Sequence, residues 1–258
     1  MDSTRRYRIV SGEITTDYPT EGFYIYQDIH TVGYRALDAD KHLAILNSSA
    51  EALFGKRLLL DAKELERQIA RLLEANKPSR IGSVKVRLTS NANGEYTLRN
   101  SEATIYDGYT MRSLRPTATY IEMTTPDSSH STSAMEQCRE LAEAMARRAG
   151  CDKGVICNAE RIVADVAYPL VALGGKTLLT HPTTLLTVEG ERIAVAAEKR
   201  GYKVRTRDVT KADLKRAEEV FLLDWQGTLP LGRLSDRIYT NIAIESLTRE
   251  VTKELKQR

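Results

Sequence analysis

The fold is decided by a polar stretch near the middle of the chain, TTPDSSHSTS at residues 124–133. Its only apolar residue is a proline, so the stretch cannot build a core and is typical of a linker. The stretch ends at Ser133, which has the S-x-x-E spacing of a capping box with Glu136 and predicts the start of a helix. The sequence therefore predicts two domains, residues 1–123 and 134–258, joined by a linker at 124–133.

The first of these regions is mainly strand-like. Short runs of β-branched and aromatic residues occur at 8–10, 23–26, 84–88 and 119–123. Within the region, apolar residues recur at helical spacing from Ala62 to Leu73, and Asp61 has the position of a helix cap. We expect this segment to be an amphipathic helix packed on a sheet.

The second region mixes both patterns. Helical spacing predicts helices at 134–149, 191–200 and 236–256, and apolar runs predict strands at 154–157, 170–173, 177–179 and 202–205. The predicted fold class is α/β (α+β), with a small N-terminal α/β domain and a larger C-terminal domain.

Composition excludes several classes of protein. The 258 residues are 41% hydrophobic and 28% charged, with a net charge of +3, which is ordinary for a globular chain. The basic run from Lys199 to Arg216 is interrupted by acidic residues, so we expect a solvated surface there and no nucleic-acid binding. Three cysteines without a C-x-x-C spacing favour a reducing cytoplasm. Neither a signal peptide nor a membrane span is expected, and the predicted location is cytoplasmic.

Common catalytic motifs are missing from the sequence. No G-x-S-x-G, H-E-x-x-H or G-x-G-x-x-G occurs. The run GGKT at 174–177 is similar to the end of a phosphate-binding P-loop, but Leu170 stands where the first glycine is needed. We therefore expect a hairpin turn there. The histidines are far apart, which predicts no metal site.

Five segments together resemble one enzyme family in order and spacing. They are YIYQ at 24–27, HLAILNSSAEAL at 42–53, and parts of 141–152, 179–192 and 208–231. The family is the class IV aminotransferases, fold-type IV pyridoxal phosphate (PLP) enzymes that include branched-chain and D-amino acid aminotransferases and aminodeoxychorismate lyase. The resemblance implies a small N-terminal α/β domain, a larger C-terminal domain and PLP in the cleft between them, usually in a homodimer. The linker at 124–133 falls where the interdomain loop of that family lies.

PLP chemistry requires a lysine that holds the cofactor as a Schiff base. Counting back from Leu141 and Gly150, the family's lysine position falls on Thr132, and no lysine occurs from Arg115 to Cys151. Threonine cannot form an imine. The alternative interpretation of Thr132 is a linker residue beside a helix cap.

The positions that would hold the phosphate also depart from the family pattern. The arginine of the H-L-x-R-L motif is Ile45 here. The phosphate turn of the family, G-I-T-R, corresponds to Gly190-Glu191-Arg192, which is one residue shorter and carries a carboxylate. The resemblance thus implies less positive charge around a phosphate than in the family.

Two further positions of the resemblance concern the ring nitrogen and the late hydroxyl of the site. The acid that would face the pyridine nitrogen falls on Ala164, and a one-residue gap would move that role to Asp165. The small hydroxyl residue of the family is replaced by Asp224 and Trp225, and a tryptophan would fill a phosphate pocket.

These departures lead to two main hypotheses. The first is a noncatalytic or repurposed scaffold, with no PLP or weakly bound PLP, that binds a small acidic metabolite or a partner protein. The alternative is an active PLP-dependent aminotransferase or aminodeoxychorismate lyase whose proton shuttle is Tyr26 or His130. A nucleic-acid binding module is the third and least supported reading.

Overall fold

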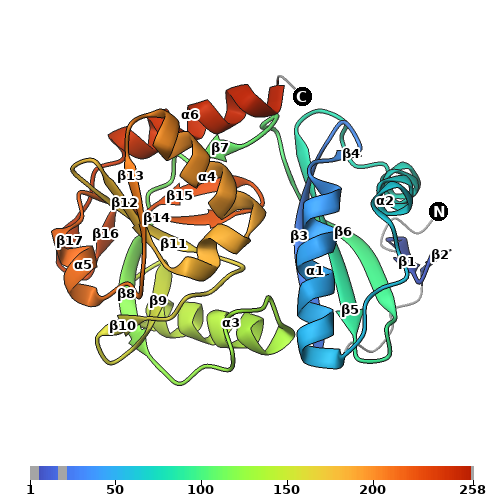
Figure 1. The fold of residues 1–258 in the computed structure, drawn as a ribbon, viewed down its shortest axis with the longest axis horizontal. Coiled ribbons are helices and arrows are strands. Elements are labelled where there is room, and N and C mark those ends of the chain that lie inside the picture. The colour runs from blue at the N-terminus through green and yellow to red at the C-terminus, as the bar shows by residue number, and fades with distance from the viewer. Residues whose placement is uncertain (1–5, 17–21, 257–258) are drawn as a thin grey trace. The chain divides into compact units, whose positions relative to one another are not determined.

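A computed structural model describes residues 6–16 and 22–256 of the chain (Figure 1). The chain divides into two compact units, Met1–Gly108 and Tyr109–Arg258. This boundary lies earlier than residue 123, where the sequence places it. The reason is that β7 (Thr110–Met111) and β8 (Thr117–Glu122) pair with strands of the second unit.

The first unit is an antiparallel sheet with two helices. The strands lie in the order β2-β1-β6-β5-β3-β4. Their bounds are Arg8–Val10 (β1), Glu13–Thr15 (β2), Tyr24–Val32 (β3), Arg35–Ala36 (β4), Ser83–Asn91 (β5) and Tyr96–Thr104 (β6). The helices are Ala39–Phe54 (α1) and Ala62–Asn76 (α2).

The start of α2 confirms the predicted cap, since the Asp61 side chain accepts a hydrogen bond from the backbone N–H of Glu64 at 2.8 Å. Its apolar stripe, which includes Leu65 and Ile69, is fully buried against strand residues such as Val86. Apolar side chains of α1 and α2 belong to one core cluster with side chains from a single face of the strands. Both helices therefore pack on the same face of the sheet.

The second unit contains two sheets. One has the order β10-β9-β8-β16-β17 and the other β13-β12-β11-β14-β15-β7. The further strands are Lys153–Asn158 (β9), Arg161–Ile162 (β10), Leu170–Gly174 (β11), Thr177–Thr180 (β12), Lys203–Thr206 (β13), Glu219–Asp224 (β14), Gly227–Pro230 (β15), Arg233–Leu234 (β16) and Arg237–Ile238 (β17). The helices are Ser133–Arg148 (α3), the 3₁₀ helix Pro182–Leu186 (η1), Val188–Lys199 (α4), Lys211–Arg216 (α5) and Ile242–Lys256 (α6).

The second unit has four layers, which follow from the way strand side chains alternate between the two faces of each sheet. On one face of β8 and β9, Ile121 and Ile156 pack against α3, while Val155 on the opposite face packs against the other sheet. In that other sheet, Ala172 lies on the face that packs against Val155. Phe221 lies on the opposite face and packs against α4 and α6. The order is therefore helix, sheet, sheet, helices.

Several local predictions differ from the structure by a few residues. The cap of α3 is Thr132 and not Ser133, because the Thr132 hydroxyl accepts from the N–H of Met135 at 3.1 Å. The predicted helix at 236–256 begins at Ile242, since β17 occupies the residues before it. The hairpin at 174–177 is confirmed by the pairing of Gly174 with Thr177.

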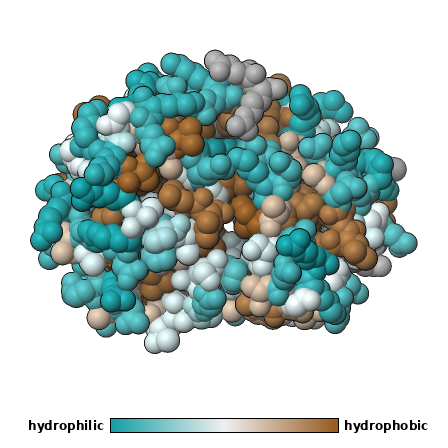
Figure 2. All heavy atoms as spheres, viewed as in Figure 1, coloured by the Kyte–Doolittle hydropathy of each residue, from teal (hydrophilic) through white to brown (hydrophobic). Residues whose placement is uncertain are grey.

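Within residues 6–16 and 22–256, no helix is both long and apolar enough to cross a membrane. Hydrophilic side chains cover much of the face shown in Figure 2. The same described residues contain no cluster of three or more histidine, cysteine, aspartate or glutamate side chains that would hold a metal ion.

Candidate functional site

Thr132 lies at the position that the family resemblance assigns to the lysine. It is 4% exposed, and its hydroxyl accepts the hydrogen bond that caps α3. An oxygen in this role satisfies one of the N–H groups that the first helical turn leaves without a partner. His130, two residues earlier, is half-buried and lies close enough to Asp127 to help lower the pKa of that carboxyl, after the larger effect of hydrogen bonds from Ser129.

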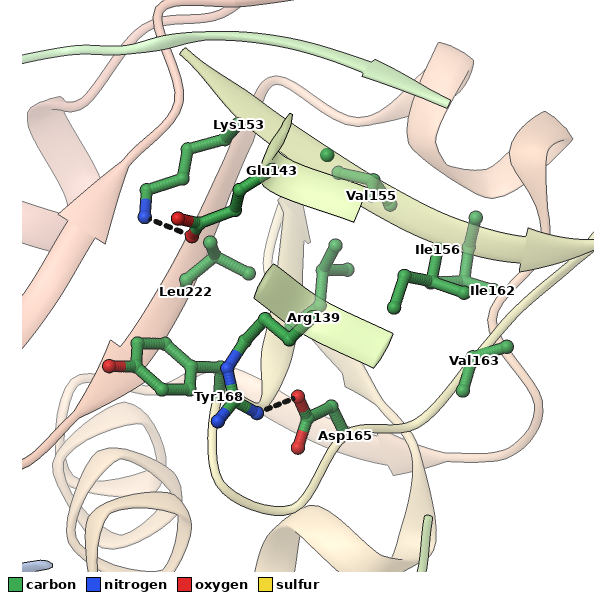
Figure 3. Close-up of a pocket in the computed structure, with 12 residues that line it drawn as sticks. Arg139, Glu143, Lys153, Val155, Ile156, Ile162, Val163, Asp165, Tyr168 and Leu222 are labelled. Carbon is green, nitrogen blue, oxygen red and sulfur yellow. Dashed lines mark hydrogen bonds and ion pairs between the residues drawn. The ribbon is translucent and has the colours of Figure 1, made fainter. Parts of the chain in front are cut away.

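Asp165 lies in the loop between β10 and β11, opposite α3 (Figure 3). Its carboxylate accepts from the Arg139 guanidinium at 2.5 Å, and that guanidinium stacks on the Tyr168 ring at 4.4 Å. Both Asp165 and Arg139 are nearly buried, with 12% and 13% of their side chains exposed. The carboxylate is therefore occupied by a protein cation.

The pocket beside this ion pair is small. Across it, Lys153 of β9 pairs with Glu143 of α3, and apolar side chains such as Leu222 line the remainder (Figure 3). Its volume of about 40 Å³ is room for a water molecule or two and not for a cofactor ring. Because both cations that line the pocket are already paired, this pocket offers no free charge to a ligand.

The Gly190-Glu191-Arg192 segment lies in the first turns of α4. Thr187 caps this helix, with its hydroxyl accepting from the Gly190 N–H at 3.0 Å. A Cβ on Gly190 would lie 1.8 Å from the carbonyl oxygen of Thr184, so only glycine allows η1 and α4 to approach so closely. Glu191 is exposed, whereas Arg192 is half-buried as a residue, with its guanidinium carbon 5.9 Å from the centre of the Tyr109 ring.

Asp224 ends β14 and Trp225 follows it, and both are buried, with 5% and 4% exposed. The Asp224 carboxylate accepts from the Arg112 guanidinium at 2.5 Å and from the backbone N–H of Gln226 at 2.9 Å. Burial raises the pKa of Asp224, and Arg112 opposes that effect. A buried carboxylate and an indole thus occupy the positions to which the sequence resemblance assigns a small hydroxyl residue.

The sequence interpretation missed a set of buried donors next to this pair. The Tyr109 hydroxyl, the Thr110 hydroxyl and the Arg112 Nε are buried and have no hydrogen-bond partner among the described residues. Burial raises the pKa of Tyr109 well above its ordinary value, with a further contribution from Glu189, so the phenol stays protonated. Three donors on one short segment are thus left without acceptors, and no sequence motif marks them.

Tyr26 and Ile45 belong to the first unit. Tyr26 is 2% exposed on β3, and the Arg87 guanidinium covers its ring at 4.1 Å. Arg87 in turn donates two hydrogen bonds to Asp28, at 2.6 and 2.8 Å. Ile45 lies half-buried on α1 and carries no charge. Within the second unit the predicted residues form two groups, one at the start of α3 and one around the start of α4 and the end of β14.

Comparison with known proteins is in line with this architecture. The profile described as "Amino-transferase class IV" matches residues 25–224. A search of curated proteins finds no significant match.

Among solved structures, the branched-chain aminotransferase of Thermoproteus uzoniensis with norvaline superimposes with a TM-score of 0.78 at 15% identity, covering 98% of this chain and 94% of that one. An aminotransferase from Brucella abortus bound to PLP gives 0.77 at 15% identity, covering 98% and 99%. A putative 4-amino-4-deoxychorismate lyase from Legionella pneumophila gives 0.71 at 16% identity, covering 91% and 90%. The resemblance found in the sequence is confirmed, and the chain belongs to the class IV aminotransferase family.

Proposed function

We propose that this chain is a noncatalytic member of the family that binds a small acidic metabolite. The observation that carries the proposal is that Thr132, which the resemblance assigns to the lysine position, is used as the cap of α3. A family member that lacks the Schiff-base amine cannot run the usual lysine-dependent chemistry. The cytoplasmic location and the homodimer expected from the sequence stay predictions.

The residues at the cofactor positions do not fit PLP. Thr132 has no amine, and its oxygen already serves the helix. Asp165, the candidate for the ring nitrogen, is held by Arg139. The Arg112 guanidinium is already paired with the buried Asp224 and cannot neutralise a phosphate dianion, and the buried Trp225 leaves less room than a small hydroxyl residue. We therefore assign no step of a reaction to this cofactor.

The proposed ligand class follows from the donors at Tyr109, Thr110 and Arg112. A buried polar group without a partner is costly, and a ligand that supplies acceptor oxygens would remove that cost. Carboxylates are rich in acceptors and form strong hydrogen bonds with guanidinium and hydroxyl groups. A small carboxylic acid is therefore the class of ligand that this donor set favours.

Titration with PLP tests the loss of catalysis. We expect no saturable visible absorption band at micromolar PLP, and no cofactor adduct on any lysine after borohydride reduction. Thr132→Lys is expected to gain no band either, because the other cofactor positions are also changed. This variant should lose about 1 kcal/mol of unfolding free energy with the cap, whereas Thr132→Ser should stay within about 0.5 kcal/mol of the native chain.

A saturable band in the native protein, together with amino-group transfer to keto acids, would instead establish the active-enzyme alternative. In that case Tyr26→Phe and His130→Gln would show which group moves the proton. A band that appears only in Thr132→Lys would mean that the loss of a single residue accounts for inactivity, which contradicts our view that the whole site has changed.

Tyr109→Phe tests the donor set. The Tyr109 hydroxyl has no partner among the described residues, so its removal should leave the unfolding free energy unchanged or raise it by up to about 1 kcal/mol. Carboxylate binding, measured by calorimetry with a panel of small dicarboxylic acids, should weaken about tenfold. A loss of more than about 1 kcal/mol of stability would show that the hydroxyl has a structural partner, and unchanged binding would remove Tyr109 from the ligand site.

A further inference from the structure

A second pocket of the second unit lies apart from the residues discussed so far. Its walls are α5, the β9–β10 turn and the β16–β17 turn, and Tyr120 of β8 also lines it. In Figure 1, α5, β16 and β17 lie together at one side of this unit. Its volume is about 290 Å³, close to the lower end of small-molecule sites. It is several times larger than the pocket beside Asp165.

Charges of both signs line this pocket on separate elements. Lys211 and Lys215 project from α5, whereas Glu160 lies on the β9–β10 turn and Asp236 on the β16–β17 turn. Among the residues that the structure describes, none of these four takes part in an ion pair. Elsewhere in the unit, cations that face carboxylates are paired, as in Arg207–Asp213 at 2.6 Å and Lys199–Glu254 at 2.5 Å.

The backbone keeps the two signs of charge apart. Thr210 and Asp213 form a capping box that fixes the start of α5. The Lys211 N–H donates to the Glu160 carbonyl oxygen at 2.9 Å, which ties the helix to the β9–β10 turn. The other turn is held by the Ser235 N–H, which donates to the Ala118 carbonyl oxygen at 2.9 Å. These backbone contacts set the positions from which the charged side chains extend.

Both turns also hold a residue in a left-handed backbone conformation. Ala159, next to Glu160, has φ 50°, and Ser235 has φ 52°, a left-handed region that non-glycine residues seldom adopt. A positive φ is what two-residue hairpin turns require, and these residues begin the turns between Asn158 and Arg161 and between Leu234 and Arg237. Here they flank the same pocket on two sides.

The ring of Tyr120 and two neutral hydroxyl groups complete the lining of the pocket. The Lys211 ammonium lies 5.5 Å from the centre of the Tyr120 ring, so the aromatic face restricts where this charge can lie. Ser235 contributes a hydroxyl group to the lining. Burial raises the pKa of Tyr120 to about 12, so its phenol is a donor at any physiological pH.

From this arrangement we propose that the pocket is a binding site for a small zwitterion, a compound that carries an ammonium and at least one carboxylate. The carboxylate would lie against Lys211 and Lys215, and the ammonium against Glu160 and Asp236. A ligand with both charges satisfies both walls at once, whereas a simple anion or cation would face two charges of its own sign on the other wall. This site is separate from the proposed carboxylate site at Tyr109.

Calorimetric titration of the full chain tests the proposal with matched probes. L-glutamate and 4-aminobutyrate carry both charges, succinate and inorganic phosphate are anions only, and putrescine is a cation only. We expect the two zwitterions to bind and the other three to bind about tenfold more weakly or not at all.

Two charge-neutralising pairs locate the binding. One double variant combines Lys211→Gln with Lys215→Gln, and the other combines Glu160→Gln with Asp236→Asn. Each double variant should weaken zwitterion binding about tenfold or more. Control pairs with the same change of charge are Lys203→Gln with Lys253→Gln, and Glu140→Gln with Glu198→Gln, and these should bind as the native chain does. All four substituted residues of the controls are exposed and lie outside the pocket.

Three outcomes would overturn the proposal. They are no binding of either zwitterion, binding that survives both pocket variants, and binding of succinate or phosphate that depends on the lysines alone. Tyr109→Phe separates the two proposed sites, because it should weaken dicarboxylate binding at the first site and leave zwitterion binding at this one unchanged.

Discussion

Gly190→Ala is expected to lower the unfolding free energy of the second unit by about 3 kcal/mol, measured by urea denaturation without any ligand. The new methyl group would lie 1.8 Å from the Thr184 oxygen, 2.7 Å from its carbonyl carbon and 2.9 Å from its Cγ2. Two of these atoms are backbone, and the Thr184 carbonyl also accepts from the Thr187 hydroxyl at 2.8 Å. The clash therefore cannot be relieved by a rotamer change.

Gly174→Ala is the matched control in the same unit. A Cβ there would meet its nearest neighbour, the Ala217 Cα, at 3.9 Å, which is ordinary contact. We expect a change within about 0.5 kcal/mol. If Gly190→Ala were equally mild, the close approach of η1 and α4 would not be what requires glycine, and a ligand-binding role for this residue would regain support.

Glu219→Ala is expected to cost about 3 kcal/mol, by the same denaturation measurement. This carboxylate is 4% exposed and accepts from the N–H groups of Ala243 and Ile244, both at 2.8 Å. It thereby caps α6 from a strand that is 24 and 25 residues away in the sequence. Without this carboxylate, the two N–H groups at the start of α6 lose their acceptor. The helix is part of the core, since its Leu247 is fully buried.

Glu219→Gln provides the graded comparison. The amide keeps one acceptor oxygen, so it should cost about 1 kcal/mol, less than the alanine variant. Equal losses for the two variants would point to the negative charge near the helix start as the main contribution, rather than the number of acceptors.

Much of the secondary structure could be predicted from the sequence because its causes are local. Asp61 caps α2 through a residue three positions on, and the hairpin at 174–177 closes within four residues. The boundary between the units could not be predicted, because it depends on β7 pairing with β15, more than a hundred residues later. The one-residue error at Ser133 arose because two neighbouring hydroxyl residues both suit a helix cap.

For the candidate site, the sequence could predict which positions to inspect but not the contacts that their side chains make. The resemblance indicated Thr132, Asp165 and Trp225, but not what each of them contacts. The partner of Asp165 is 26 residues away, and Arg112 and Asp224 are 112 apart. Pairings over such distances leave no trace in one sequence, since any of many arginines could fill the role. The buried donors on 109–112 were missed for the same reason.

The position of β7 and β8 also matters during synthesis on the ribosome. All six strands of the first sheet have been translated once residue 104 is made. In contrast, β7 must wait for β15, and the edge of β8 that does not pair with β9 must wait for β16; β15 and β16 end at residues 230 and 234. Nascent chains therefore carry two unpaired strand edges through most of the translation of the second unit, and chaperone binding should concentrate on this interval.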